Sequence, residues 1–129
     1  MNTVIALSIG ASLGAISRWA LGQWLNVAGH VGIGWGTLAS NCIGAYLIGI
    51  GYVWLHSQPG IDPIWRLLLI TGFVGALTTF STFSLETIQL LADGHAGSAL
   101  ANVATNLAGS LVLTYLGLLS GQAFWHITK

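Results

Sequence analysis

The sequence predicts an all-α integral membrane protein with four transmembrane helices per subunit. Two observations lead to this class. Charged residues make up only 5% of the 129 residues, against roughly a quarter in an ordinary soluble domain, which is too few to build a surface that faces water. The chain also contains 18 glycines, which suit close helix contacts in lipid better than helices in water.

Four stretches are long and apolar enough to cross a bilayer, which requires about 20 mostly apolar residues. They cover roughly residues 3–24, 33–55, 64–91 and 98–124. The connections between them are short and leave no room for a soluble domain, so residues 1–129 are expected to form a single membrane domain.

The six tryptophans support these boundaries, because Trp prefers the interface between membrane and water. None of them falls in the middle of a predicted span. Two lie late in the first span, one early in the second and one at its end, one at the start of the third and one at the end of the fourth: Trp19, Trp24, Trp35, Trp54, Trp65 and Trp125.

The basic residues give little information about orientation. Arg66 and Lys129 lie on the side of both termini, and Arg18 lies toward the other side. An excess of Lys and Arg in cytoplasmic loops normally sets orientation, and two against one is a weak excess. The chain is therefore expected to insert both ways round, which would permit an antiparallel, dual-topology homodimer.

Small residues recur four positions apart in the first two spans, in GASLG at 10–14 and at Ser40 with Gly44. Such spacing lets two helices approach closely. It also arises easily in a glycine-rich apolar sequence, so oligomerisation and chance explain it equally well.

Polar residues inside spans are functional hypotheses by default, because an unpaired polar group in lipid is unfavourable. In the second span, Asn41 could join helices or solvate an ion, since an amide offers two N–H donors and an acceptor oxygen. In the fourth span, polar residues recur at every fourth position and so share one helix face. This stripe fits a permeation track and a helix-packing seam equally well; it contains Asn102, Asn106, Ser110 and Thr114.

The third span contains the segment GALTTFSTFSLE at 75–86, in which we predict a break in the helix. Gly72 and Gly75 precede the β-branched Thr78 and Thr79, and all four are weak helix formers. A break within a span is tolerated only where the freed backbone groups line a cavity or meet a partner. Freed carbonyls near Gly75 to Thr78 could coordinate a cation, as unwound segments of transporters do.

Two phenylalanines follow the predicted break. Phe80 and Phe83 are three residues apart and therefore share a helix face. The positive edge of an aromatic ring can favour an anion without a fixed charge, and the hydroxyls of Ser81 and Thr82 supply donors nearby. Packing of both rings in the protein core is the alternative interpretation.

With these residues the sequence resembles the fluoride channel family known as Fluc or CrcB. The resemblance covers essentially the whole chain, and its central block is the most specific. The blocks are GASLGAISRW at 10–19, GTLASNCIGAYLIG at 36–49, GFVGALTTFSTFSLE at 72–86 and NLAGSLVLT at 106–114. It implies an antiparallel homodimer in the lipid bilayer of the bacterial plasma (inner) membrane, with two pores that conduct fluoride passively and lower cytoplasmic fluoride.

The resemblance also implies roles for individual residues. Phe80 and Phe83 would line the fluoride path, with Asn41 as its amide donor. Ser110 and Thr114 match positions on the hydroxyl-bearing side of the pore, and Asn106 fits a common family pattern and is included in the fluoride path. Backbone carbonyls at Gly75 and Thr78 of both subunits would hold a structural sodium ion. Arg18 and Glu86 match positions near the ends of the pore. At Asn102 some members carry an aromatic hydroxyl, so the resemblance assigns it no role.

Other classes of protein fit less well. A small dual-topology, proton-coupled multidrug exporter also has four short spans, but it would carry a carboxylate in the first span, and residues 3–17 contain none. A structural subunit without transport is a further alternative. A nucleic-acid partner is not expected, because the few basic residues are scattered. An enzyme is not expected either, because the histidines lack metal-ligand spacing: His30, His56, His95 and His126.

Overall fold

The computed structural model describes residues 2–26 and 32–126, and over these residues it is helical with no strand. Lys129 and His30 lie outside this range. The elements are α1 (Asn2–Leu25), α2 (Trp35–Ser57), α3 (Pro63–Arg66), the π-helical segment η1 (Leu67–Val74), α4 (Gly75–Leu77), α5 (Phe80–Ala92) and α6 (Ala96–His126).

Within the described residues, four helical segments are long and apolar enough to cross a membrane. They are Asn2–Leu25, Trp35–Ser57, Pro63–Ala92 and Ala96–Trp125. Their ends differ from the predicted spans by about two residues or fewer. The prediction of four membrane-spanning helices is therefore confirmed, and the third of them is made up of α3, η1, α4 and α5.

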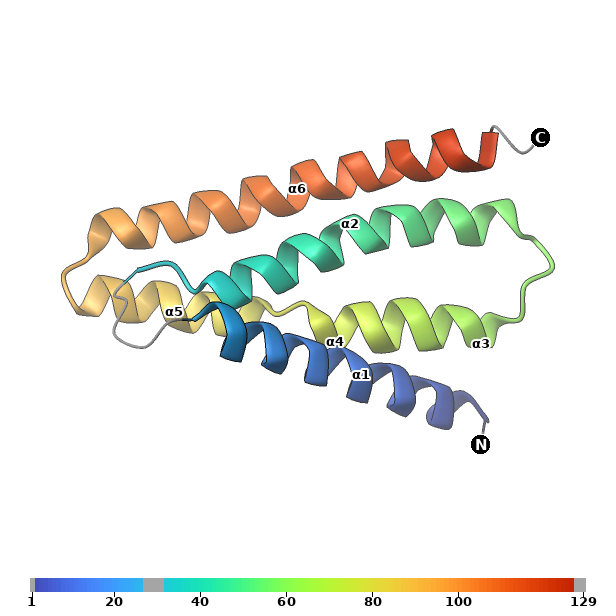
Figure 1. The fold of residues 1–129 in the computed structure, drawn as a ribbon, viewed down its shortest axis with the longest axis horizontal. Helices are drawn as coiled ribbons and strands as arrows, with labels where there is room; N and C mark the ends of the chain where they lie inside the picture. The colour runs from blue at the N-terminus through green and yellow to red at the C-terminus, as the bar shows by residue number, and fades with distance from the viewer. Residues whose placement is uncertain (1, 27–31, 127–129) are drawn as a thin grey trace.

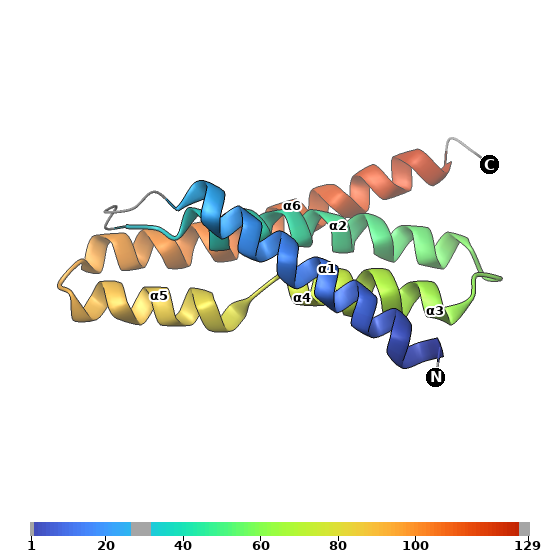
Figure 2. The same cartoon turned by 60° about the horizontal axis from the view of Figure 1, so that its bottom comes forward.

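The four segments run alternately in opposite directions (Figure 1). The start of α1, the end of α6 and the connection between α2 and α3 lie at one end of the molecule. The turn between α5 and α6 lies at the other end. Helix α6 packs along α2, and α1 crosses η1 and α4 obliquely (Figure 2). The central parts of α2 and α6 are thereby placed beside the third span.

Residues with specific backbone preferences define the ends of the third span. Asp62 caps α3 by accepting a hydrogen bond from the backbone N–H of Ile64 at 2.9 Å, and Pro63 occupies the first helical position. At the other end, Gly94 adopts a positive φ of 79°. The N–H groups of Gly94 and His95 then donate to the carbonyls of Leu91 and Leu90, which is a Schellman motif. This turn sends α6 back alongside α5.

The GASLG motif at 10–14 forms a contact within the chain. A Cβ on Gly10 would collide with the carbonyl oxygen of Leu68, and one on Gly14 would collide with that of Phe73. Both acceptors belong to η1, so the two glycines let α1 rest directly on the backbone of the third span. The motif is therefore used to pack one subunit.

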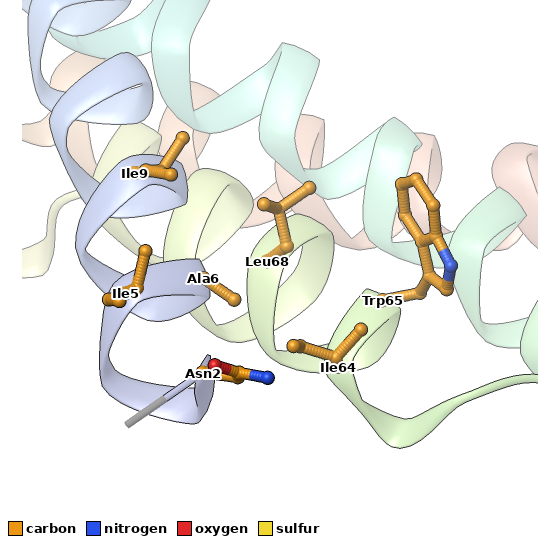
Figure 3. Close-up of a pocket in the computed structure, with 7 residues that line it drawn as sticks. All are labelled: Asn2, Ile5, Ala6, Ile9, Ile64, Trp65 and Leu68. Atoms are coloured by element: carbon orange, nitrogen blue, oxygen red, sulfur yellow. The ribbon is translucent and has the colours of Figure 1, made fainter.

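An apolar pocket of about 270 Å³ lies between α1 and the start of the third span (Figure 3). Its lining residues are Asn2, Ile5, Ala6, Ile9, Ile64, Trp65 and Leu68. None of them is ionisable, and none belongs to the polar groups discussed below. This pocket is therefore separate from the candidate site.

Candidate functional site

The backbone of the third span is extended at two residues. Helix α4 ends at Leu77, Thr78 has φ −80° and ψ 152°, and Thr79 has φ −150° and ψ 119° before α5 begins at Phe80. The Thr78 N–H still donates to the Val74 carbonyl at 3.1 Å, but the helical pattern of hydrogen bonds does not continue beyond it. Because buried backbone N–H and C=O groups are almost always paired, those at this position require other partners.

Asn41 on α2 supplies partners for both backbone groups of Thr79. Its Oδ1 accepts from the Thr79 N–H at 2.7 Å, and its Nδ2 donates to the Thr79 carbonyl at 3.1 Å. Nδ2 also donates to Oδ1 of Asn106 on α6 at 3.0 Å. An amide has two N–H donors, so both are in use. In this arrangement Asn41 joins α2, the extended segment and α6.

The Thr79 side chain caps α5. Its hydroxyl accepts from the Thr82 N–H at 3.2 Å, donates to the Thr82 hydroxyl at 3.0 Å and lies 3.3 Å from the Ser81 hydroxyl. Thr is a favoured residue at this N-cap position. Although Thr79 was not predicted as a site residue, its position directly before a hydrophobic helical run is the signal that could have identified it.

Backbone carbonyls lose their helical partners at the extended segment, and those of Gly75 and Thr78 are among them. In a continuous helix, the Gly75 carbonyl would accept from the Thr79 N–H and the Thr78 carbonyl from the Thr82 N–H. Here the Thr79 N–H donates to Asn41, and the Thr82 N–H donates to the Thr79 hydroxyl. The oxygens of Gly75 and Thr78 are thus released from helical pairing.

An open groove of about 410 Å³ runs along the extended segment. Residues of α2, of the third span and of α6 line it. Most of the predicted site residues line it: Asn41, Gly75, Thr78, Phe80, Phe83, Asn106 and Ser110, together with Thr79. The rest of its lining is glycine, alanine and aliphatic side chains. Among residues 2–26 and 32–126, no Lys, Arg, Asp or Glu belongs to this lining. The groove is therefore an uncharged concavity with polar groups along its length.

The two phenylalanines meet in this groove. The ring centroids of Phe80 and Phe83 are 5.5 Å apart, and the rings are inclined by 60°. Phe83 is 7% exposed, whereas Phe80 is 76% exposed. Phe83 therefore packs within the chain, while Phe80 projects from it.

A second, more polar hollow of about 330 Å³ contains Arg18 and Glu86. The Thr37 hydroxyl donates to Oε1 of Glu86 at 2.6 Å. In the described part of the chain, the buried atoms Oε2 of Glu86 and Nε of Arg18 have no hydrogen-bond partner. The carboxylate lies against Gly34 at the start of α2, where a helix favours negative charge. Thr79 lines both this hollow and the groove.

Some predicted residues lie apart from the groove lining. Ser81 is exposed, and its hydroxyl lies 3.3 Å from the Thr79 hydroxyl. Thr82 lines the hollow, and Thr114 belongs to neither lining. Asn102 is fully buried and donates to the Thr87 hydroxyl at 3.0 Å. Sequence reasoning also missed Thr37 and Thr87, whose partners are distant in the sequence.

Four membrane-spanning segments and an uncharged groove with polar groups define a multi-pass membrane protein with a polar site among its spans. Residues 5–118 match the family model described as "CrcB-like protein, Camphor Resistance (CrcB)". The chain belongs to this family. The resemblance found in the sequence is thereby confirmed.

Curated relatives resemble the chain over nearly its whole length. The chain is 48% identical over 120 residues to the "Fluoride-specific ion channel FluC" of Variovorax paradoxus, covering 93% of this chain and 94% of the relative. It is 46% identical over 125 residues to the protein of that name from Enterobacter sp., covering 97% and 93%. With the one from Proteus mirabilis it shares 45% identity over 130 residues, covering 100% and 98%.

Proposed function

We propose that the chain is a fluoride-selective passive ion channel of the bacterial inner membrane that lowers cytoplasmic fluoride. The observation that carries this proposal is the uncharged groove, in which amide, hydroxyl and aromatic groups meet at an extended backbone segment. The near-full-length similarity to proteins named as fluoride-specific channels supports it. On this proposal the protein is a channel and not an enzyme.

The composition of the groove suits a small anion. Conduction requires binding that is strong enough for entry and weak enough for exit. The edges of the Phe80 and Phe83 rings and the Ser110 hydroxyl offer positive partial charges without a full cation. The guanidinium of Arg18 lies in the adjoining hollow, where it can attract an anion without holding it in the groove.

The working unit is proposed to be an antiparallel homodimer with two pores. In one chain the groove is open on one side, and Phe80 projects out of it with 76% of its surface exposed. A second copy would cover this side and bury the ring. The weak charge bias of the sequence permits insertion in both orientations.

A structural sodium ion fits the chemistry of the extended segment. Hard cations take oxygen ligands, and unwound carbonyls hold Na⁺ in transporters. The released carbonyls of Gly75 and Thr78 provide two oxygens per chain. We therefore propose that both subunits share one ion, which holds the two extended segments together.

Replacing either phenylalanine with isoleucine is expected to preserve assembly and slow fluoride flux roughly tenfold or more, corresponding to about 1.4 kcal/mol. Isoleucine fills much of the space but lacks the positive ring edge. Fluoride efflux from liposomes containing Phe80→Ile or Phe83→Ile measures this. Leu111→Ile, a change of aliphatic shape in the same groove, is the control and should be nearly neutral. Unchanged flux in both Phe variants would return the rings to a packing role.

Removing sodium is expected to lower both thermal stability and fluoride flux, because the released carbonyls would be left without a partner. The measurement is the melting temperature of the purified protein and its flux in buffers in which N-methylglucamine replaces sodium. Returning sodium should restore both. A protein indifferent to this exchange has no structural sodium ion.

A further inference from the structure

Four side chains form a continuous chain of hydrogen bonds that begins at the extended segment and ends on α5. Asn41 donates to Oδ1 of Asn106 at 3.0 Å, Asn106 donates to Oδ1 of Asn102 at 3.1 Å, and Asn102 donates to the Thr87 hydroxyl at 3.0 Å. Thr87 donates in turn to the Phe83 carbonyl at 2.8 Å. We call these four residues the amide relay.

The partners at both ends of the amide relay require its hydrogen bonds to be donated in one direction, from Asn41 toward Thr87. At one end, the Thr79 N–H can only donate, so it requires Oδ1 of Asn41 to face it. At the other end, Thr87 gives its proton to the Phe83 carbonyl, so its oxygen can only accept from Asn102. Between these ends, each amide presents an oxygen to the preceding residue and an N–H to the next.

Burial makes this direction hard to reverse. Asn102 is 0% exposed and Asn106 is 4% exposed, so water cannot readily replace a lost partner. Asn106 also donates to the backbone carbonyl of Asn102 at 3.1 Å. Turning one amide over would place N–H against N–H or oxygen against oxygen. Leaving such a buried group unpaired is strongly unfavourable.

We propose that Thr87 and Asn102 are positioning residues, which set the orientation of the Asn106 and Asn41 amides that line the groove. Neither Thr87 nor Asn102 lines the groove itself, whereas Asn41 and Asn106 do. Their influence on a permeating ion therefore passes through the amide relay. The consequence for fluoride rests on the proposed function, but the control of amide orientation does not.

The amide relay is tested by variants that remove or retain the Thr87 hydroxyl. Thr87→Val keeps the side-chain shape but removes the acceptor for Asn102, and Thr87→Ser retains the hydroxyl. Thr105→Val is the control. The Thr105 hydroxyl also donates to the carbonyl four residues earlier, that of Ala101, at 2.8 Å. It lies 3.3 Å from the backbone carbonyl of Asn102 as well, and Thr105→Val therefore tests the loss of a hydroxyl beside the amide relay that leaves its side-chain bonds in place. All three are purified and reconstituted as full-length protein.

The first readout is NMR of the side-chain amides in protein labelled with ¹⁵N at asparagine only, since the sequence contains Asn at just positions 2, 26, 41, 102 and 106. We expect Thr87→Val to shift the side-chain amide signals of Asn106 and Asn41 as well as that of Asn102. Thr87→Ser should retain the wild-type pattern, and Thr105→Val should leave all five nearly unchanged. Shifts confined to Asn102 would overturn the proposal, as would equal shifts in Thr87→Ser and Thr87→Val.

The second readout is fluoride flux from liposomes. Thr87→Val is expected to slow it roughly tenfold, while Thr87→Ser and Thr105→Val retain at least about half of the wild-type rate; a tenfold change corresponds to about 1.4 kcal/mol. Wild-type flux in Thr87→Val would overturn the link to permeation. If the wild-type protein passes no fluoride, the proposed function fails, and the NMR result still decides whether the amide relay orients Asn41.

Discussion

Asn41→Leu is expected to abolish fluoride flux and to destabilise the protein. Leucine has a similar size but leaves the N–H and C=O of Thr79 without the partners that Asn41 provides. Each buried unsatisfied group costs about 1–3 kcal/mol. Flux from liposomes and the melting temperature in detergent measure both effects. Asn2→Leu, at an exposed position at the start of α1, is the control and should leave both unchanged.

Asn41→Asp separates the loss of the donor from the loss of the whole amide. Aspartate retains an oxygen for the Thr79 N–H, but its second oxygen faces the Thr79 carbonyl and Oδ1 of Asn106, which are both acceptors. We therefore expect impaired flux in this variant as well. Normal throughput in both Asn41 variants would contradict the role of Asn41 at the extended segment.

Gly14→Val is expected to prevent α1 from docking on the third span. A side chain at position 14 would collide with the backbone carbonyl of Phe73, and backbone cannot rotate away as a side-chain end can. Overpacking by side chains alone typically costs about 1–3 kcal/mol, so a collision with backbone should cost at least as much. We expect little or no monodisperse protein in size-exclusion chromatography after membrane extraction.

The matched control for this prediction is Gly97→Ala on α6. A Cβ at Gly97 meets no atom within 4 Å, and alanine favours helix over glycine by about 1 kcal/mol in a helix interior. This variant should be purified with wild-type yield and elution. If Gly14→Val behaved in the same way, the close contact between α1 and η1 would be wrong.

The four spans could be predicted because the signal is local. Length, apolar composition and the positions of tryptophan depend on each segment separately, and the predicted ends lie within about two residues of the observed helices. The π-helical form of Leu67–Val74 could not be predicted, because it gives no distinct periodic signal in so apolar a stretch. The packing of GASLG at 10–14 against the third span of the same chain could not be predicted either, because the motif does not indicate which helix it contacts.

The candidate site could be predicted only in its residue types. Asn41, the phenylalanine pair and the polar face of the fourth span stand out because polar and aromatic groups are rare in the middle of apolar segments. Their partners were not predictable, because Asn41 and Thr79 are 38 positions apart and Asn41 and Asn106 are 65 apart. The cap formed by Thr79 and the bond between Asn102 and Thr87 likewise depend on how the helices come together.

Ion efflux from liposomes containing the purified protein tests the central claim most directly. The liposomes are loaded with fluoride or chloride, and a potassium shunt prevents charge build-up. Rapid release of fluoride with retention of chloride is the predicted result. Equal release of both anions would contradict selectivity. If neither anion is released and a proton gradient instead drives transport of a cationic dye, the channel proposal is contradicted. The multidrug exporter is then the better interpretation, and Glu86 becomes the residue to mutate.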